Sequence, residues 1–105
     1  MSFKVIGTET YLNQIEKLPN DYKQIAEKFP EKLKENPSKG KLLAPFLREK
    51  RIKERRIYYI VYDDLKLVLL VAMSDKKAQQ ETIDRIKNTL DEYRKIAKEI
   101  TKQVF

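Results

Sequence analysis

Two apolar runs separated by four residues constrain the fold of this chain most. Residues 55–62 read "RRIYYIVY" and residues 67–73 read "LVLLVAM". Both runs are rich in β-branched and aromatic residues, and the intervening "DDLK" has the composition of a tight turn. The runs therefore predict an antiparallel hairpin. Because each strand is apolar on both faces, we expect two central strands that are covered on both sides or line a concave site.

The segments before the hairpin predict a strand, two helices and a polar strand. Thr8 is a typical N-cap residue, and Pro19 ends the first helix. Pro30 lies inside the apolar pattern of the second helix, where we expect a kink or a restart. The expected elements are a strand at 3–6, a helical hairpin within 8–35, a loop at 36–40 and a basic strand at 44–52.

The last segment predicts one long helix. Its apolar positions follow a strict 3, 4 spacing: Ile83, Ile86, Leu90, Tyr93, Ala97, Ile100 and Val104. A helix from 79 to 105 would be ~40 Å long, about the length of the whole domain. Its stripe can pack on the sheet or the helix pair, or its distal half can meet a partner or a second copy. We therefore expect one α+β domain over 1–105, of order β-α-α-β-β-β-α, with an antiparallel sheet and a long helix at 78–105.

The composition excludes several classes of protein. With 105 residues, 37% of them charged and 41% hydrophobic, the chain can build a single core. No apolar run approaches the ~20 residues that span a bilayer, and the N-terminus lacks a signal-peptide pattern. We therefore expect a soluble cytoplasmic protein without membrane contact. The absence of cysteine and histidine excludes disulfides, imidazole catalysis and most zinc sites, so we expect no metal and no cofactor.

The positive charge is concentrated in one stretch. Residues 39–56 carry eight lysines and arginines against two glutamates, which accounts for +6 of the net +7. Such a block is typical of a polyanion-binding surface. The alternative is a solvated edge strand, since lysine-rich edges resist aggregation. The mixture of arginine with lysine favours the binding surface.

The groups available for chemistry are cationic and phenolic. Gly7 and Gly40 are the only glycines, so there is no phosphate-binding loop, and Asp63 and Asp64 fit a turn better than a metal site. Arginine and lysine can stabilise the pentavalent phosphate formed when a ribose 2′-hydroxyl attacks its own phosphodiester. A lysine crowded by cations can move protons, and tyrosines can stack on bases. A histidine-free ribonuclease is thus chemically feasible.

Strand alternation groups the candidate residues. Arg56, Tyr58 and Tyr62 share one strand face, which we expect to be the open one. Near the hairpin, Arg48 and Lys50 share a face of the preceding strand, and we expect that face to lie beside Arg56. Two lysines, Lys76 and Lys77, follow the strand at 67–73. Antiparallel pairing also brings them to the end of the sheet where Arg56 lies.

Three short motifs in order resemble the RelE/ParE superfamily of type II toxin–antitoxin toxins. They are "RRIYY" at 55–59, "DDLK" at 63–66 and "SDKK" at 74–77, and the order of elements extends the resemblance over 1–77. The RelE branch implies ribosome-dependent cleavage of mRNA by 2′-hydroxyl attack. It implies that Arg56 stabilises the transition state and that Lys77 takes the place of an arginine on the leaving group or phosphate.

The resemblance also implies the rest of a site. Arg48 and Lys50 fall near the branch's strand lysines, so the expected catalytic set is Arg56, Lys77, Arg48 and Lys50. The expected RNA-binding set is Arg51, Lys53, Arg55, Tyr58, Tyr62 and Lys76. RelE toxins often carry a tyrosine shortly after the cationic motif, but here Ile83 falls closest.

Two other functions stay open. One is a ParE-like inhibitor of DNA gyrase, and the other is a non-catalytic basic domain that binds RNA or the ribosome. The expected partners are a cognate antitoxin, mRNA and the ribosome. The apolar stripe of the C-terminal helix also offers a surface for a homodimer or a partner contact.

Overall fold

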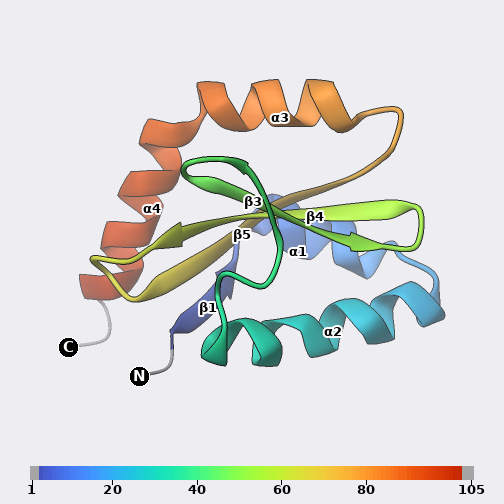
Figure 1. Ribbon diagram of the computed structural model, residues 1–105, viewed down its shortest axis with the longest axis horizontal. Helices are drawn as coiled ribbons and strands as arrows, with labels where there is room; N and C mark the ends of the chain where they lie inside the picture. Colours follow the sequence, from blue (N-terminus) through green and yellow to red (C-terminus); the bar gives the residue numbers. More distant parts are fainter. Residues whose placement is uncertain (1–2, 103–105) are drawn as a thin grey trace.

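A five-stranded sheet carries the two apolar runs at its centre (Figure 1). The structure is a computed structural model that describes residues 3–102. The strands lie in the order β1-β5-β4-β3-β2, with helices on both faces. The elements are β1 (Lys4–Gly7), α1 (Glu9–Glu16), α2 (Asn20–Glu35), β2 (Lys41–Ala44), β3 (Leu47–Ile52), β4 (Arg55–Tyr62), β5 (Leu67–Asp75), α3 (Gln79–Asn88) and α4 (Leu90–Lys102).

The predicted central hairpin is confirmed. Strands β4 and β5 pair antiparallel from Arg55 opposite Asp75 to Tyr62 opposite Leu67, with a bulge midway. The sheet is nevertheless mixed, because β1 pairs parallel with β5. The expected antiparallel pairing holds for β2 to β5 and fails only for β1, which can lie parallel to β5 because a long connection that contains helices separates the two strands in the chain. The basic strand expected at 44–52 corresponds to β3, and a short strand that was not expected, β2, precedes it and pairs antiparallel with it.

Each face of the sheet has its own core. Helices α1 and α2 cover one face, where Phe29 and Leu33 pack against Tyr59 and its neighbours. Helices α3 and α4 cover the other, where Ile86 packs with Tyr58. Tyr58 and Tyr59 are both fully buried, on opposite faces, as alternation along β4 requires. The expected α+β class is therefore confirmed, and the central strands are covered on both faces, as one of the two expectations for them requires.

The C-terminal segment is two helices with a sharp turn between them, and the prediction of one long helix is wrong (Figure 1). Helix α3 ends at Asn88, and the Thr89 hydroxyl donates to the Arg85 carbonyl at 2.7 Å. The heptad stripe is real but folds back over the sheet, so Ile83 and Ile100 both pack on the second core. A ~40 Å rod would exceed the longest extent of the molecule, 37 Å. The last stripe position, Val104, lies outside the described residues.

The N-terminal helices also differ in one detail from expectation. Thr8 is the N-cap of α1, and its hydroxyl accepts from the Tyr11 amide at 3.2 Å, as predicted. Helix α2 runs through Pro30 without a restart, because the burial of Phe29 and Leu33 on the sheet holds both of its halves. Within residues 3–102, no helix combines the length and apolar character that crossing a membrane requires.

One side chain completes the edge of β5. Strand β1 is short and leaves the end of β5 without a neighbouring strand. The Gln14 amide fills this place: it donates to the Met73 carbonyl at 3.0 Å and accepts from the Met73 amide at 2.8 Å. Gln14 therefore acts as a substitute strand just before the segment that leads to Lys76 and Lys77.

Candidate functional site: a basic groove

The start of β4 and the end of β5 meet at a cleft. Arg56 lies opposite Ser74 in the register, and β5 ends one residue later. A cleft of about 460 Å³ opens there, lined by Arg51, Glu54, Arg56, Asp75, Lys76 and Lys77. The prediction that the arginines at the start of β4 and the lysines after β5 lie close together in space is confirmed for Arg56, whereas Arg55 does not line this cleft.

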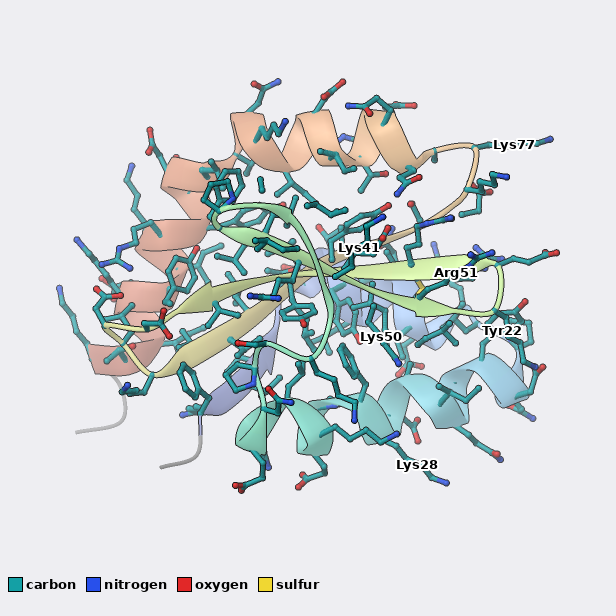
Figure 2. All side chains as sticks on the ribbon, in the orientation of Figure 1. Tyr22, Lys28, Lys41, Lys50, Arg51 and Lys77 are labelled. Atoms are coloured by element: carbon teal, nitrogen blue, oxygen red, sulfur yellow. The ribbon has the colours of Figure 1, made fainter. Side chains whose placement is uncertain are left out.

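A second hollow continues the first. It has a volume of about 430 Å³ and is lined by Lys39, Gly40, Lys41, Glu49, Lys50, Arg51, Arg56 and Gln79. Arg51 and Arg56 line both hollows, so the two adjoin at these side chains. We call the two hollows together the basic groove. Lys77 lies on the segment that leads into α3, Arg51 lies near the β3–β4 turn, and Lys41 lies nearer the middle of the molecule (Figure 2).

Charge in the basic groove is strongly unbalanced. Seven lysines and arginines line it, against the three acids Glu49, Glu54 and Asp75. One acid is already used, because the Asp75 carboxylate accepts from the Ala78 amide at 2.9 Å at the start of α3. Among the described residues, no cluster of carboxylates could hold a metal ion. The groove therefore offers positive charge and hydrogen-bond donors, which suit an extended polyanion.

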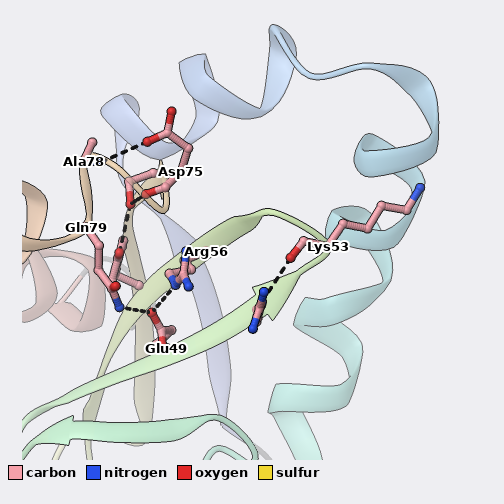
Figure 3. Close-up of polar contacts among 9 residues, drawn as sticks. Glu49, Lys53, Arg56, Asp75, Ala78 and Gln79 are labelled. Carbon is pink, nitrogen blue, oxygen red and sulfur yellow. Dashed lines mark hydrogen bonds and ion pairs between the residues drawn. The ribbon is translucent and has the colours of Figure 1, made fainter.

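Arg56 is the most buried cation of the groove. Its side chain is 9% exposed, and its Nε lies 3.1 Å from Glu49 Oε1 (Figure 3). The same oxygen accepts from Gln79 Nε2 at 2.9 Å, which links strand β3 to the first residue of α3. Arg56 Nη1 is buried without a hydrogen-bond partner among the described residues. The Arg56 guanidinium is thus ion-paired through Nε, while its Nη1 lacks a hydrogen-bond partner among the described residues.

Arg48 and Lys50 do not share the sheet face of Arg56, so the prediction that this face of β3 lies beside Arg56 is wrong. Residues directly opposite in an antiparallel pair share a face, and Arg51 is opposite Arg56. Arg48 lies on the other face and donates to the Gly40 and Ser38 carbonyls at 3.0 and 3.2 Å. Lys50 lies 6.0 Å from the centre of the Phe29 ring on that same face, although it also lines the second hollow.

The tyrosines on the Arg56 face are not open to solvent, and the expectation of an open face is wrong. Tyr58 is fully buried, and its hydroxyl is 2.8 Å from Ser74 Oγ. Burial raises the pKa of the Tyr58 phenol, against the opposing effect of this hydrogen bond. Burial raises the pKa of Tyr62 to about 12, and Arg94 lies 5.3 Å from its ring. Helices α3 and α4 cover this face, so the Tyr58 ring has no free face for a base, and the partly buried Tyr62 ring lies against Arg94.

The remaining predicted RNA-binding cations divide into two groups. Lys76 lines the groove with Arg51, as the prediction requires. Lys53 and Arg55 instead lie over the Tyr22 ring, at 5.0 and 6.0 Å from its centre. Lys53 also pairs with Asp21 at 2.6 Å (Figure 3 shows its side chain pointing away from Arg56). These two cations face the N-terminal helices and lie outside the groove lining.

Sequence reasoning missed the two residues that hold Arg56. Glu49 was counted only as a negative charge, and Gln79 was placed only as the start of a helix. The signal for Glu49 was the two-residue turn at 53–54, which fixes Arg51 opposite Arg56 and puts Glu49 on the same face. No local signal could have found Gln79, because its contact depends on how α3 packs on the sheet.

Comparison with known proteins identifies the fold. No family model matches the chain, and no curated protein matches it significantly. Solved structures do match. The RelBE2 toxin–antitoxin complex of Mycobacterium tuberculosis has a TM-score of 0.64 at 21% identity, over 72% of this chain and 100% of that one.

Two further structures agree with this match. The E. coli toxin RelE in the free state, carrying two substitutions, has a TM-score of 0.67 at 20% identity, over 82% of this chain and 99% of that one. The archaeal RelE–RelB complex from Pyrococcus horikoshii has a TM-score of 0.63 at 15% identity, over 72% of this chain and 97% of that one. The protein therefore has the fold of these RelE structures.

Proposed function

We propose that this protein is the toxin of a type II toxin–antitoxin system and that it cleaves mRNA on the ribosome. The carrying observation is the basic groove, where Arg51, Arg56, Lys76 and Lys77 converge on one cleft. The RelE-like fold supports the proposal, since the matching structures from M. tuberculosis and P. horikoshii are toxins in complex with an antitoxin. A cognate antitoxin that covers the groove would keep the protein inactive.

The proposed reaction needs no histidine. The 2′-hydroxyl of the RNA attacks the adjacent phosphorus, a bond to the 5′-oxygen breaks, and a 2′,3′-cyclic phosphate forms with a free 5′-hydroxyl. Arg56 stabilises the extra negative charge on the pentavalent phosphate. Lys77 and Lys76 are exposed at the groove mouth and neutralise the backbone or assist the leaving oxygen. Tyr58 has no part in the proton transfers, because it is buried and its pKa is raised.

The side chains that line the basic groove are consistent with a reaction that depends on the ribosome. The structure describes no exposed tyrosine in the groove lining, and Ile83, at the place of the usual tyrosine, is half-buried in the second core. The protein alone therefore positions phosphate better than it positions a base. We propose that the ribosome supplies the missing positioning of the codon.

A second candidate is a non-catalytic protein that binds RNA or the ribosome. The observation that favours it is the ion pair of Arg56 with Glu49, which neutralises the main candidate for transition-state stabilisation. Such a protein would bind RNA through the basic groove and leave it intact.

Cell-free translation with mapping of mRNA 5′ ends tests both candidates. The wild-type protein should produce cuts within codons that depend on ribosomes. Arg56→Ala should lower the cleavage rate by about 10²–10³, the usual effect of losing one donor to a developing oxyanion. Arg85→Ala is the matched control, because Arg85 pairs with Glu81 on exposed α3, and it should cleave like wild type. Inhibited translation with intact mRNA would favour the non-catalytic candidate, and stalled gyrase with intact mRNA would favour a ParE-like activity.

A further inference from the structure

Glu49 occupies a position in the groove where a carboxylate is unexpected. It is 7% exposed, on the inner strand β3, and sits among cations that line the groove. A buried carboxylate costs free energy unless it is paired and hydrogen-bonded. Arg56 and Gln79 supply this compensation, and both contact the same oxygen, Oε1.

Arg56 is not fully satisfied by this arrangement. Its Nε faces Glu49, while its Nη1 is buried and has no partner among the described residues. A buried guanidinium nitrogen without a partner carries a desolvation cost, and such groups in folded proteins call for an explanation. Because Arg56 also lines both hollows of the groove, a small rotation toward the groove would give its free donors access to an anion.

We propose that the Glu49 carboxylate competes with the RNA phosphate for the Arg56 guanidinium. Glu49 holds Arg56 in a resting position, and a backbone phosphate must displace the carboxylate before it can bind Arg56. The chemistry of the two acceptors is alike, since carboxylate and phosphate oxygens both take charge-assisted hydrogen bonds from a guanidinium. This competition rests on the proposed function in one respect: the basic groove must bind a phosphate backbone. It does not require that the RNA is cleaved.

Gln79 makes the exchange feasible. When Arg56 turns to the phosphate, the Glu49 carboxylate would be left as an unpaired buried charge, which is strongly unfavourable. Gln79 keeps its hydrogen bond to Oε1 and remains with the carboxylate (Figure 3). Gln79 is thus a positioning residue, and it ties the exchange to the docking of the first turn of α3.

A binding measurement with an uncleavable probe tests the proposal. The probe is a fluorescein-labelled 2′-O-methyl RNA hexamer, and its Kd is measured by anisotropy for Glu49→Gln and for Glu81→Gln. Both variants gain one positive charge, but Glu81 is exposed on the outer side of α3 and, among the described residues, pairs only with Arg85. Glu49→Gln should bind about tenfold more tightly than Glu81→Gln, the order of one charge-assisted hydrogen bond that no longer has to be exchanged. Equal affinities of the two variants would overturn the proposal.

A second measurement avoids the risk that Glu49→Gln fails to fold. In the wild-type protein, the Nε–H signal of Arg56 is followed by ¹⁵N NMR during titration with the same hexamer. The signal should shift with the midpoint of the anisotropy curve, because Nε exchanges its partner. A signal that stays in place while the hexamer binds would refute the competition.

The two proposals can fail independently. The hexamer has no free 2′-hydroxyl, so neither measurement depends on cleavage. A wild-type protein that leaves mRNA intact but shows the Arg56 shift would refute the nuclease and support the competition. Cleavage of mRNA, together with an Arg56 Nε–H signal that does not shift and equal affinities of Glu49→Gln and Glu81→Gln for the hexamer, would support the nuclease and refute the competition.

Discussion

Replacing Lys77 by alanine should weaken RNA binding in a way that depends on salt. Lys77 is exposed at the mouth of the groove and forms no ion pair with a described residue. A lysine that contacts a backbone phosphate releases a counterion from single-stranded nucleic acid, which contributes about 0.7 to the slope of log K against log salt. The structure therefore assigns Lys77 a measurable share of the salt dependence.

The magnitude follows from the groove lining. Six of its seven cations have no ion-pair partner among the described residues, the exception being Arg56. A hexamer has about five internucleotide phosphates, so if five of these cations, Lys77 among them, each contact one phosphate, the wild-type slope should be about −3.5 and the Lys77→Ala slope about −2.8. Between 1 M and 0.1 M salt, a change of 0.7 in slope corresponds to a loss of about fivefold in affinity at the lower concentration.

The assay is anisotropy with the 2′-O-methyl hexamer at four or more salt concentrations. Lys28→Ala is the control, because Lys28 is an exposed residue of α2, outside the groove lining (Figure 2). Both variants lose one positive charge, so a general effect of net charge would lower both slopes alike. Equal slopes for the two variants, or a wild-type slope near zero, would show that the groove does not bind the backbone.

Two stability predictions follow from contacts outside the groove. Asp64 pairs with Arg94, and this hydrogen bond lowers the pKa of the Asp64 carboxyl below 3.8. Its contribution is therefore present above pH ~4 and is lost as the pH falls through the lowered pKa, so Asp64→Asn should flatten the acid limb of urea-unfolding free energies measured from pH 6 to 2. Gln14→Ala removes both hydrogen bonds to Met73 and should cost about 1–2 kcal/mol. Hydrogen exchange should show a faster Met73 amide, and unchanged protection there would contradict the role of Gln14 as a substitute strand.

The central part of the fold could be predicted because its signals are local. The turn at 63–66 and the two apolar runs determine the hairpin, and the hairpin alone brings Arg56 and Lys77 to one end of the sheet. The break between α3 and α4 could not be predicted from the apolar pattern. A 3, 4 apolar spacing fits one straight helix and two helices that wrap a sheet equally well. The spacing of Thr89 and Glu92 matches a capping box and was the available hint.

The groove could be predicted only in part, because its composition depends on strand parity. A shift of one residue in register moves a side chain to the other face of the sheet. The sequence suggested Arg48 and Lys50 as neighbours of Arg56, but the turn at 53–54 makes Arg51 the opposite residue. The tyrosines were misplaced for a different reason, since the burial of Tyr58 depends on the second helix pair folding back over β4.

The position of β3 favours one of the two interpretations of the basic block at 39–56. A solvated edge strand would keep its cations in water to prevent pairing with other chains. The edge strand on this side is β2, and β3 lies inside the sheet between β2 and β4. Lysines and arginines on an inner strand give no protection to an edge, and Glu49 beside them is buried. The charge of β3 is therefore better explained by a ligand than by solubility, and Arg51 is the residue whose exposure and place in both hollows make that explanation most specific.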